Sequence, residues 1–217
     1  MNYFAHALPH LDRPYFVAGV ALPDWMNIVD RRLKVRSRHA AAFVTDANPE
    51  LAEFAAGVMR HHADDAWFHD QREFVETSMK LSVSLREWLP EDAGMRRGFL
   101  GHILVELLLD AFLIERQPER LEAYYNALSR CDPATIQDFV AQIAPRPTVG
   151  IAPLVPRFIA ERFLYDYSDN AKLWFRLNQV MRRVGLPILP ECLVDWLSTA
   201  RQNVYLVAES LLPPPVT

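Results

Sequence analysis

The sequence NPELAEFAAGVMRHHADDAWFH, residues 48–69, carries the signals of a long helix. Asn48 suits the N-cap, Pro49 suits the first helical position, and Glu50 lies in the first turn. Apolar residues then recur at helical spacing, at Leu51, Phe54, Ala55, Val58 and Met59. We therefore predict a helix from Leu51 to about residue 74.

The rest of the chain has a similar pattern of helical segments separated by prolines. We expect further helices over residues 75–89, 91–115, from 118 onward, 133–143, 154–165, 169–184 and 191–211. The pattern of the first 45 residues is less regular. It predicts a short helix near 13–21, a turn at Leu22-Pro23-Asp24 and a helix around His39. The chain has only 7 glycines and no Asn-Gly or Asp-Gly pair, which disfavours a large antiparallel sheet.

Length and composition favour one all-α domain covering residues 1–217. With 217 residues, 51% of them hydrophobic, the chain can bury a substantial core as a multi-helix bundle. No apolar run reaches the ~20 residues that span a bilayer. The net charge of -4 argues against a general nucleic-acid binder, although residues 31–36 form a local basic patch. Two isolated cysteines and the absence of a signal peptide favour the cytoplasm.

Metal-ligating residue types recur every four positions in two segments. His61, Asp65 and His69 form one set, and His102 begins a second set that continues with Glu106 and Asp110. Residues four apart lie on one helix face, so each set forms a stripe of donors. Two facing stripes would build a metal site between helices. Asp65 is the natural bridge between two ions because His61 and His69 are about 12 Å apart along the axis.

Three residues of the irregular N-terminal region are further ligand candidates: His6, Asp24 and His39. The mixture of imidazole and carboxylate suits Zn, Mn or Fe better than Mg or Ca. Two or more such ions would lower the pKa of a bound water and polarise a phosphoryl oxygen. Asp24 or Asp110 would then serve as general base or would orient a ligating histidine.

A structural explanation competes with the metal site. A single His-x3-acid pair is commonly a surface contact worth ~0.2–0.5 kcal/mol. The second set lies in the apolar sequence GFLGHILVELLLDAFL, residues 98–113, where buried charges need partners. Arginines could provide those partners instead of a metal ion. The alternative is therefore a non-catalytic helical protein with a structural metal or buried ion pairs.

Several motifs resemble those of the acyl-carrier-protein phosphodiesterases, helical relatives of the HD-type metal hydrolases. The start MNYFAH, the segment AGVALPDW at 18–25, GVMRHHADD at 57–65, ELLLDAFL at 106–113 and PRFI at 156–159 occur in the family's order. The chain departs from that pattern at His69, His102 and Ala111. With these changes, the ligand order resembles that of zinc-dependent phospholipase C.

Both resemblances imply an HD-like or phospholipase C-like bundle that hydrolyses phosphodiesters. They imply a small phosphodiester or an acyl carrier protein as substrate, with a phosphopantetheinyl ester as one option. The phospholipase-like order implies the ligand set His6, Asp24, His39, His61, Asp65, His69, His102 and Glu106. Arg60, Arg36 and Arg38 are candidate phosphate contacts, with solvated helix charges as the simpler interpretation.

Overall fold

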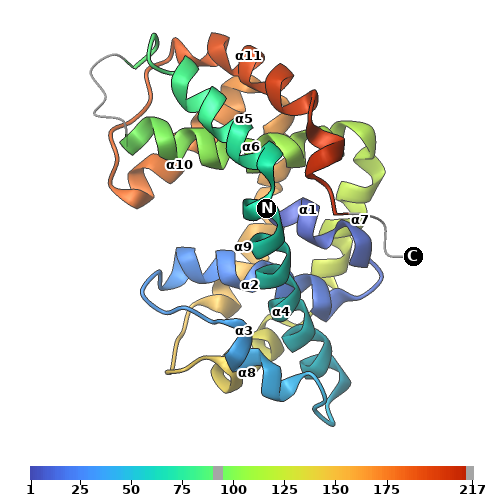
Figure 1. Cartoon of the computed structure of the whole chain (residues 1–217). Coiled ribbons are helices and arrows are strands. Elements are labelled where there is room, and N and C mark those ends of the chain that lie inside the picture. Colours follow the sequence, from blue (N-terminus) through green and yellow to red (C-terminus); the bar gives the residue numbers. More distant parts are fainter. Residues whose placement is uncertain (90–94, 214–217) are drawn as a thin grey trace. The chain divides into compact units, whose positions relative to one another are not determined.

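The computed structural model describes residues 1–89 and 95–213, and within them every regular element is a helix (Figure 1). The predicted all-α class is therefore confirmed. The chain divides into two compact units. Unit 1 contains residues 1–2, 67–116 and 163–217, whereas unit 2 contains residues 3–66 and 117–162. The expectation of one domain over 1–217 stays a prediction.

Unit 2 contains nine helical elements, counting α4 up to Ala66. They are α1 (Tyr3–Ala7), η1 (Leu8–His10), α2 (Pro14–Val29), α3 (Ser37–Ala40), η2 (Ala41–Phe43), α4 (Pro49–Asp70), α7 (Pro118–Ser129), α8 (Pro133–Ile143) and α9 (Ile151–Glu161). Buried aromatic rings join four of them: Phe4 packs on Tyr124, and both Trp25 and Tyr124 pack edge-on against Phe158. This cluster fixes the short helix α1 against α2, α7 and α9.

Two glycines allow α2 and α4 to cross with almost no space between their backbones. A Cβ atom on Gly19 would lie 2.1 Å from the carbonyl oxygen of Phe54, and one on Gly57 would lie 2.2 Å from that of Phe16. Such distances are far inside van der Waals contact, so only glycine fits at either position. The crossing brings the backbone of α2 directly against the side chains of α4.

Unit 1 contains the end of α4 and the following helices. They are α5 (Arg72–Ser84), α6 (Met95–Arg116), η3 (Phe163–Ser168), α10 (Asn170–Val184), α11 (Leu193–Tyr205) and η4 (Ala208–Leu211). Helices α5 and α6 also meet at a glycine, because a Cβ atom on Gly101 would lie 2.4 Å from the carbonyl oxygen of Ser78. The Trp196 indole of α11 donates to Ser84 Oγ at 3.1 Å.

Most predicted helices are present with shifted ends. The helices that begin at Pro118 and Pro133 do so as expected, and Asp132 caps the latter by accepting from the Thr135 N–H at 2.8 Å. The predicted helix start at residue 91 lies outside the described residues. The predicted 154–165 and 191–211 helices are instead Ile151–Glu161 and Leu193–Tyr205, each followed by a 3-10 segment.

The predicted turn at Leu22-Pro23-Asp24 is wrong, because α2 continues through Pro23 to Val29. A proline inside a helix costs about 3 kcal/mol. Trp25 and Met26, which follow Pro23, are 0% and 1% exposed. Burying two large side chains offsets that cost.

The predicted helix end near residue 74 is also wrong, because α4 ends at Asp70 and α5 begins at Arg72. Gln71 between them adopts extended backbone angles, and its side-chain amide donates to the Trp67 carbonyl at 2.9 Å. That bond satisfies one of the carbonyls left open at a helix end. A polar residue with this local role gives little signal in hydrophobic periodicity.

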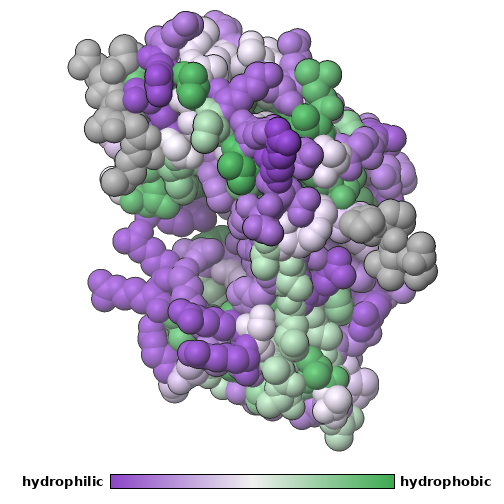
Figure 2. Space-filling model, in the orientation of Figure 1, coloured by the Kyte–Doolittle hydropathy of each residue, from purple (hydrophilic) through white to green (hydrophobic). Residues whose placement is uncertain are grey.

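Hydrophilic side chains cover much of the molecular face in Figure 2. Among the described residues, no helix combines the length and apolar character needed to cross a membrane.

Candidate metal centres

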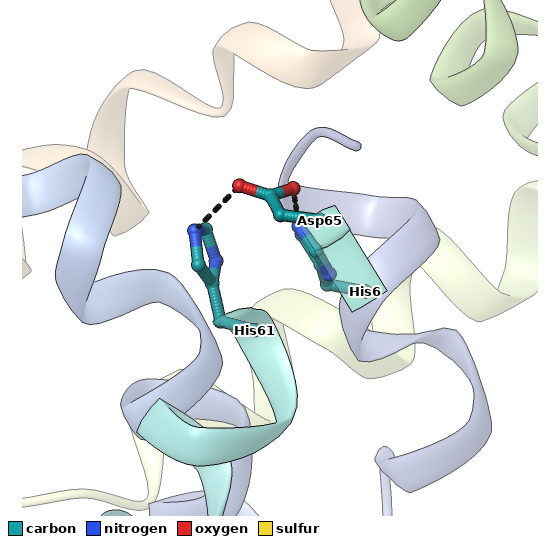
Figure 3. A group of neighbouring side chains, drawn as sticks. All are labelled: His6, His61 and Asp65. Carbon is teal, nitrogen blue, oxygen red and sulfur yellow. Dashed lines mark ion pairs between the residues drawn. The ribbon is translucent and has the colours of Figure 1, made fainter. Parts of the chain in front are cut away.

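Three side chains of unit 2 that could together hold a metal ion lie close to one another (Figure 3). His6 comes from α1, whereas His61 and Asp65 lie one turn apart on α4. His6 Nε2 lies 3.2 Å from Asp65 Oδ1, and His61 Nε2 lies 3.3 Å from Asp65 Oδ2. The two imidazole rings stack with their centroids 4.4 Å apart. We call His6, His61 and Asp65 the first donor group.

Each histidine of the first donor group also forms a hydrogen bond through its other ring nitrogen, Nδ1. His6 Nδ1 lies 3.2 Å from Asp64 Oδ2, and His61 Nδ1 lies 2.9 Å from the Val20 carbonyl oxygen. A carbonyl or carboxylate oxygen only accepts, so each Nδ1 carries the hydrogen. Both Nε2 lone pairs are therefore directed at Asp65. Partners of this kind orient ligating histidines in known metal sites.

The facing acceptors leave a place for a cation. His6 is 1% exposed, and within the described residues its Nε2 has no hydrogen-bond partner of normal geometry although Asp65 Oδ1 is only 3.2 Å away. Two electron-rich atoms at that distance repel each other unless a proton or a metal ion lies between them. Three such atoms, two nitrogens and a carboxylate oxygen, are a donor set that fits a divalent ion.

Electrostatics keep both aspartates of this region ionised. Burial raises the pKa of Asp65, but the His6 and His61 imidazoles at its two oxygens outweigh burial and hold the pKa below its usual value. Burial likewise opposes ionisation of Asp64, and bonds from His6 and Arg60 bring its pKa below normal. Burial lowers the pKa of His6, yet Asp64 and Asp65 raise it overall. A carboxylate that stays ionised is a ready metal ligand.

The local sequence explains how Val20 reaches His61. Gly19 and Gly57 let α2 and α4 touch, so the carbonyl next to Gly19 comes within hydrogen-bonding distance of the ring one turn beyond Gly57. A carbonyl oxygen has two lone pairs, so that of Val20 can accept from His61 while it remains part of α2. The close crossing thus positions the His61 ring of the first donor group.

A second group of three side chains that could hold a metal ion lies in unit 1. His69 is in the last turn of α4, and His102 and Glu106 lie one turn apart on α6. Glu106 Oε1 lies 3.0 Å from His69 Nε2 and 3.1 Å from His102 Nε2. We call these residues the second donor group. The ring of Phe74 packs against both imidazoles, with centroids 4.9 Å from each.

The second donor group is more open than the first. The side chains of His69 and His102 are 34% and 47% exposed, whereas that of Glu106 is 17% exposed. Burial raises the pKa of Glu106, but the charged N-terminus and bonds from His102 and His69 bring it to about 2. Among the described residues, no acceptor bonds to the Nδ1 atom of either histidine.

Three residues predicted from the sequence belong to neither donor group. Asp24 is half-buried in α2, and His39 caps α3 by accepting from the Arg36 N–H at 3.1 Å. Asp110 is fully buried and accepts from the Asn2 amide at 3.0 Å. A ligand role for Asp24 and His39, and a catalytic role for Asp24 and Asp110, stay predictions.

Asp64, the partner of His6, is not among the site residues predicted from the sequence. Asp64 points about 100° away from Asp65 around the helix, so the stripe of donors excludes it. Its neighbour Arg60, one of the candidate phosphate contacts, places Nε 2.6 Å from Asp64 Oδ1. The signal available in the sequence was the doubled acid at 64–65, which offers one carboxylate to a metal and one to an outer partner.

No protein-family model matches this chain, and neither a curated protein nor a solved structure matches it. The donor geometry is therefore the main evidence on function.

Proposed function

We propose that the protein is a metal-dependent hydrolase of phosphodiesters, with the first donor group as its catalytic centre. The supporting observation is the convergence of His6 Nε2, His61 Nε2 and Asp65, with each ring held at Nδ1 by a separate acceptor. Three protein ligands are typical of catalytic zinc sites, which leave a further position for water or substrate. Closed structural sites use four.

The chain's own residues prepare this centre. A divalent ion bound there would lower the pKa of water toward neutrality and polarise a phosphoryl oxygen. Asp65 supplies negative charge, because its neighbouring histidines keep it ionised. Asp64 and the Val20 carbonyl fix the two rings, so that no reorientation is needed when the site is loaded.

The second donor group supports the proposal of more than one ion. Two histidines and a glutamate form the ligand set found in several zinc hydrolases. Zn, Mn and Fe all suit this chemistry better than Mg or Ca. We accordingly expect at least two ions per chain.

The proposed substrate class and cellular compartment are inferred from the sequence. The resemblances to acyl-carrier-protein phosphodiesterases and to zinc-dependent phospholipase C favour an HD-like or phospholipase C-like bundle acting on a phosphodiester. A phosphopantetheinyl ester, or the acyl carrier protein that bears it, is one such substrate. The cysteines Cys131 and Cys192 are both free, which suits the reducing cytoplasm.

One observation favours the alternative of a non-catalytic protein. Arg60, Asp64, His6 and Asp65 form a chain of ion pairs without any metal, with successive N–O distances of 2.6, 3.2 and 3.2 Å. Such a network would stabilise buried charges by itself. In that case the protein would bind no metal, or would retain it without turnover.

Metal analysis and an activity assay on purified protein separate these proposals. We expect bound Zn, Mn or Fe, and hydrolysis of bis(p-nitrophenyl) phosphate that EDTA abolishes and the metal restores. Asp65→Asn should remove both properties, whereas Asp138→Asn, on the exposed face of α8, should change neither. Absence of metal and of activity in the wild type after loading with Zn or Mn would favour the ion-pair network.

A further inference from the structure

An exposed basic segment lies next to the first donor group in unit 2. Residues 31–38, with the sequence RRLKVRSR, carry five cationic side chains in a chain of net charge -4. We call residues 31–38 the basic segment. It leads from the end of α2 into α3.

The backbone of the basic segment displays its charges in a row. Leu33 and Val35 are each 2% exposed, whereas Arg32, Lys34 and Arg36 are exposed. Arg36 has extended backbone angles, φ -98° and ψ 161°. In extended chain, alternate residues point to the same side about 6–7 Å apart. Burial of Leu33 and Val35 therefore places Lys34 and Arg36 on the solvent side, and Arg32 is exposed in the turn that precedes them.

Hydrogen bonds hold the basic segment beside the candidate metal centre. His62, the residue after the ligand His61, has Nε2 2.8 Å from the Val35 carbonyl oxygen. The rings of His61 and His62 are 5.4 Å apart. Lys34 donates to the Asn27 side chain at 2.6 Å, and Asp30 at the start of the loop pairs with Arg146 at 2.6 Å. The segment is thus attached at Val35, at Lys34 just before it, and at Asp30, which precedes the segment.

Four of the five cations of the basic segment have no acidic partner within the described residues. Within residues 1–89 and 95–213, no carboxylate forms an ion pair with Arg32, Lys34, Arg36 or Arg38. The nearest acid in sequence, Asp30, is already paired with Arg146. Unneutralised cations concentrate positive potential at the surface and attract anions.

We propose that the basic segment binds an anionic group of the substrate other than the phosphodiester that is cleaved. The preferred substrates are then soluble phosphodiesters that carry at least one further phosphate. Arginine side chains bind phosphate through paired, charge-assisted hydrogen bonds, and the row of cations offers several such donors. This inference rests on the proposed function for its catalytic part, but the binding part can be measured separately.

Kinetics on two matched substrates test the catalytic part. The p-nitrophenyl ester of thymidine 5'-phosphate has one anionic group, and its 3'-phosphorylated counterpart has a second. We expect the wild type to have a KM at least about tenfold lower for the latter, a difference of about 1.4 kcal/mol in binding. The triple variant R32Q/K34Q/R36Q should lose this preference, with similar KM values for the two esters.

A matched control variant separates local binding from net charge. Lys80, Arg86 and Arg157 are exposed cations outside the basic segment and form no ion pair within the part of the chain that the structure describes. The variant K80Q/R86Q/R157Q therefore removes the same total charge, and should retain the wild-type preference. If both triple variants lost the preference for the 3'-phosphorylated ester to the same extent, the proposal would be overturned.

Calorimetric binding of tripolyphosphate to the purified full chain provides a test that needs no turnover. Binding to the wild type and control, with loss of at least about tenfold in affinity for R32Q/K34Q/R36Q, supports the proposal even if no phosphodiester is cleaved. In that event only the proposed function fails. Equal affinity in all three proteins, no binding, or binding only to phosphatidylserine vesicles would overturn it.

Discussion

The two donor groups contain the same ligand types but differ in how they are held. In the first, His6 and His61 are nearly fully buried, and each has an acceptor behind its ring. In the second, His69 and His102 are one-third to one-half exposed and have no such acceptor among the described residues. The difference indicates that convergence of ligands and rigidity of ligands are separate properties. We expect the first donor group to bind its ion more tightly.

The largest effect should come from removing the carboxylate of the first donor group. Asp65→Asn keeps the size of the side chain but takes away the charge that faces both Nε2 atoms. We expect one fewer ion per chain and at least about a 100-fold loss of kcat/KM. This loss exceeds the about 10–100-fold that removal of a hydrogen-bond partner of a metal ligand typically causes. Metal analysis and kinetics on bis(p-nitrophenyl) phosphate measure both. Full activity in this variant would place the chemistry elsewhere.

Asp64→Asn tests whether the hydrogen bond from His6 Nδ1 to Asp64 is the reason for tighter metal binding by the first donor group. The amide oxygen still accepts but carries no full negative charge, so the hydrogen bond from His6 weakens and the ring is held less firmly. Metal affinity should fall about 10–100-fold, with folding retained. A competitive titration against a chromophoric chelator gives the affinity, and circular dichroism checks the fold. An unchanged affinity would mean that orientation of His6 contributes nothing.

His102→Ala removes a ligand of the second donor group and leaves the first intact. The protein should lose its more weakly held ion, and the activity should fall by less than about tenfold, or about 1.4 kcal/mol in the barrier. Isothermal titration with Zn gives the stoichiometry and both affinities. If this variant loses the tighter ion, the order of affinities predicted from burial and orientation is reversed.

Gly57→Ala should destabilise unit 2 through the crossing of α2 and α4. Its Cβ atom would lie 2.2 Å from the Phe16 carbonyl oxygen, so the helices must separate. Overpacking of this kind costs about 1–3 kcal/mol, and urea unfolding measures it. Gly98→Ala is the control, because nothing lies within 4 Å of its Cβ position and an exposed helical alanine gains about 0.5–1 kcal/mol. Equal stability of both variants would refute the tight crossing.

Local spacing predicted those parts of the site that lie on one helix. His61 with Asp65, and His102 with Glu106, are four residues apart, and the helix brings each pair together as expected. His69 could be assigned to the second pair only in three dimensions. Periodicity depends on neighbours along the chain, so it says nothing about which helix faces which.

The parts that the sequence did not reveal depend on tertiary packing. Asp64 points away from the donor stripe and becomes relevant because α1 brings His6 to it. The Val20 carbonyl is a backbone group with no sequence signature at all, and only the Gly19–Gly57 crossing makes it a partner of His61. The continuation of α2 through Pro23 likewise depends on the burial of Trp25 rather than on local propensity.

A crystal structure of the Zn-loaded protein, with anomalous data collected at the zinc edge, tests the first donor group most directly. We predict an anomalous peak about 2.0–2.2 Å from His6 Nε2, His61 Nε2 and an Asp65 oxygen, with Asp64 and the Val20 carbonyl still at the two Nδ1 atoms. A zinc-soaked crystal with no peak there, and with Arg60, Asp64, His6 and Asp65 paired as before, would contradict a metal centre at this position.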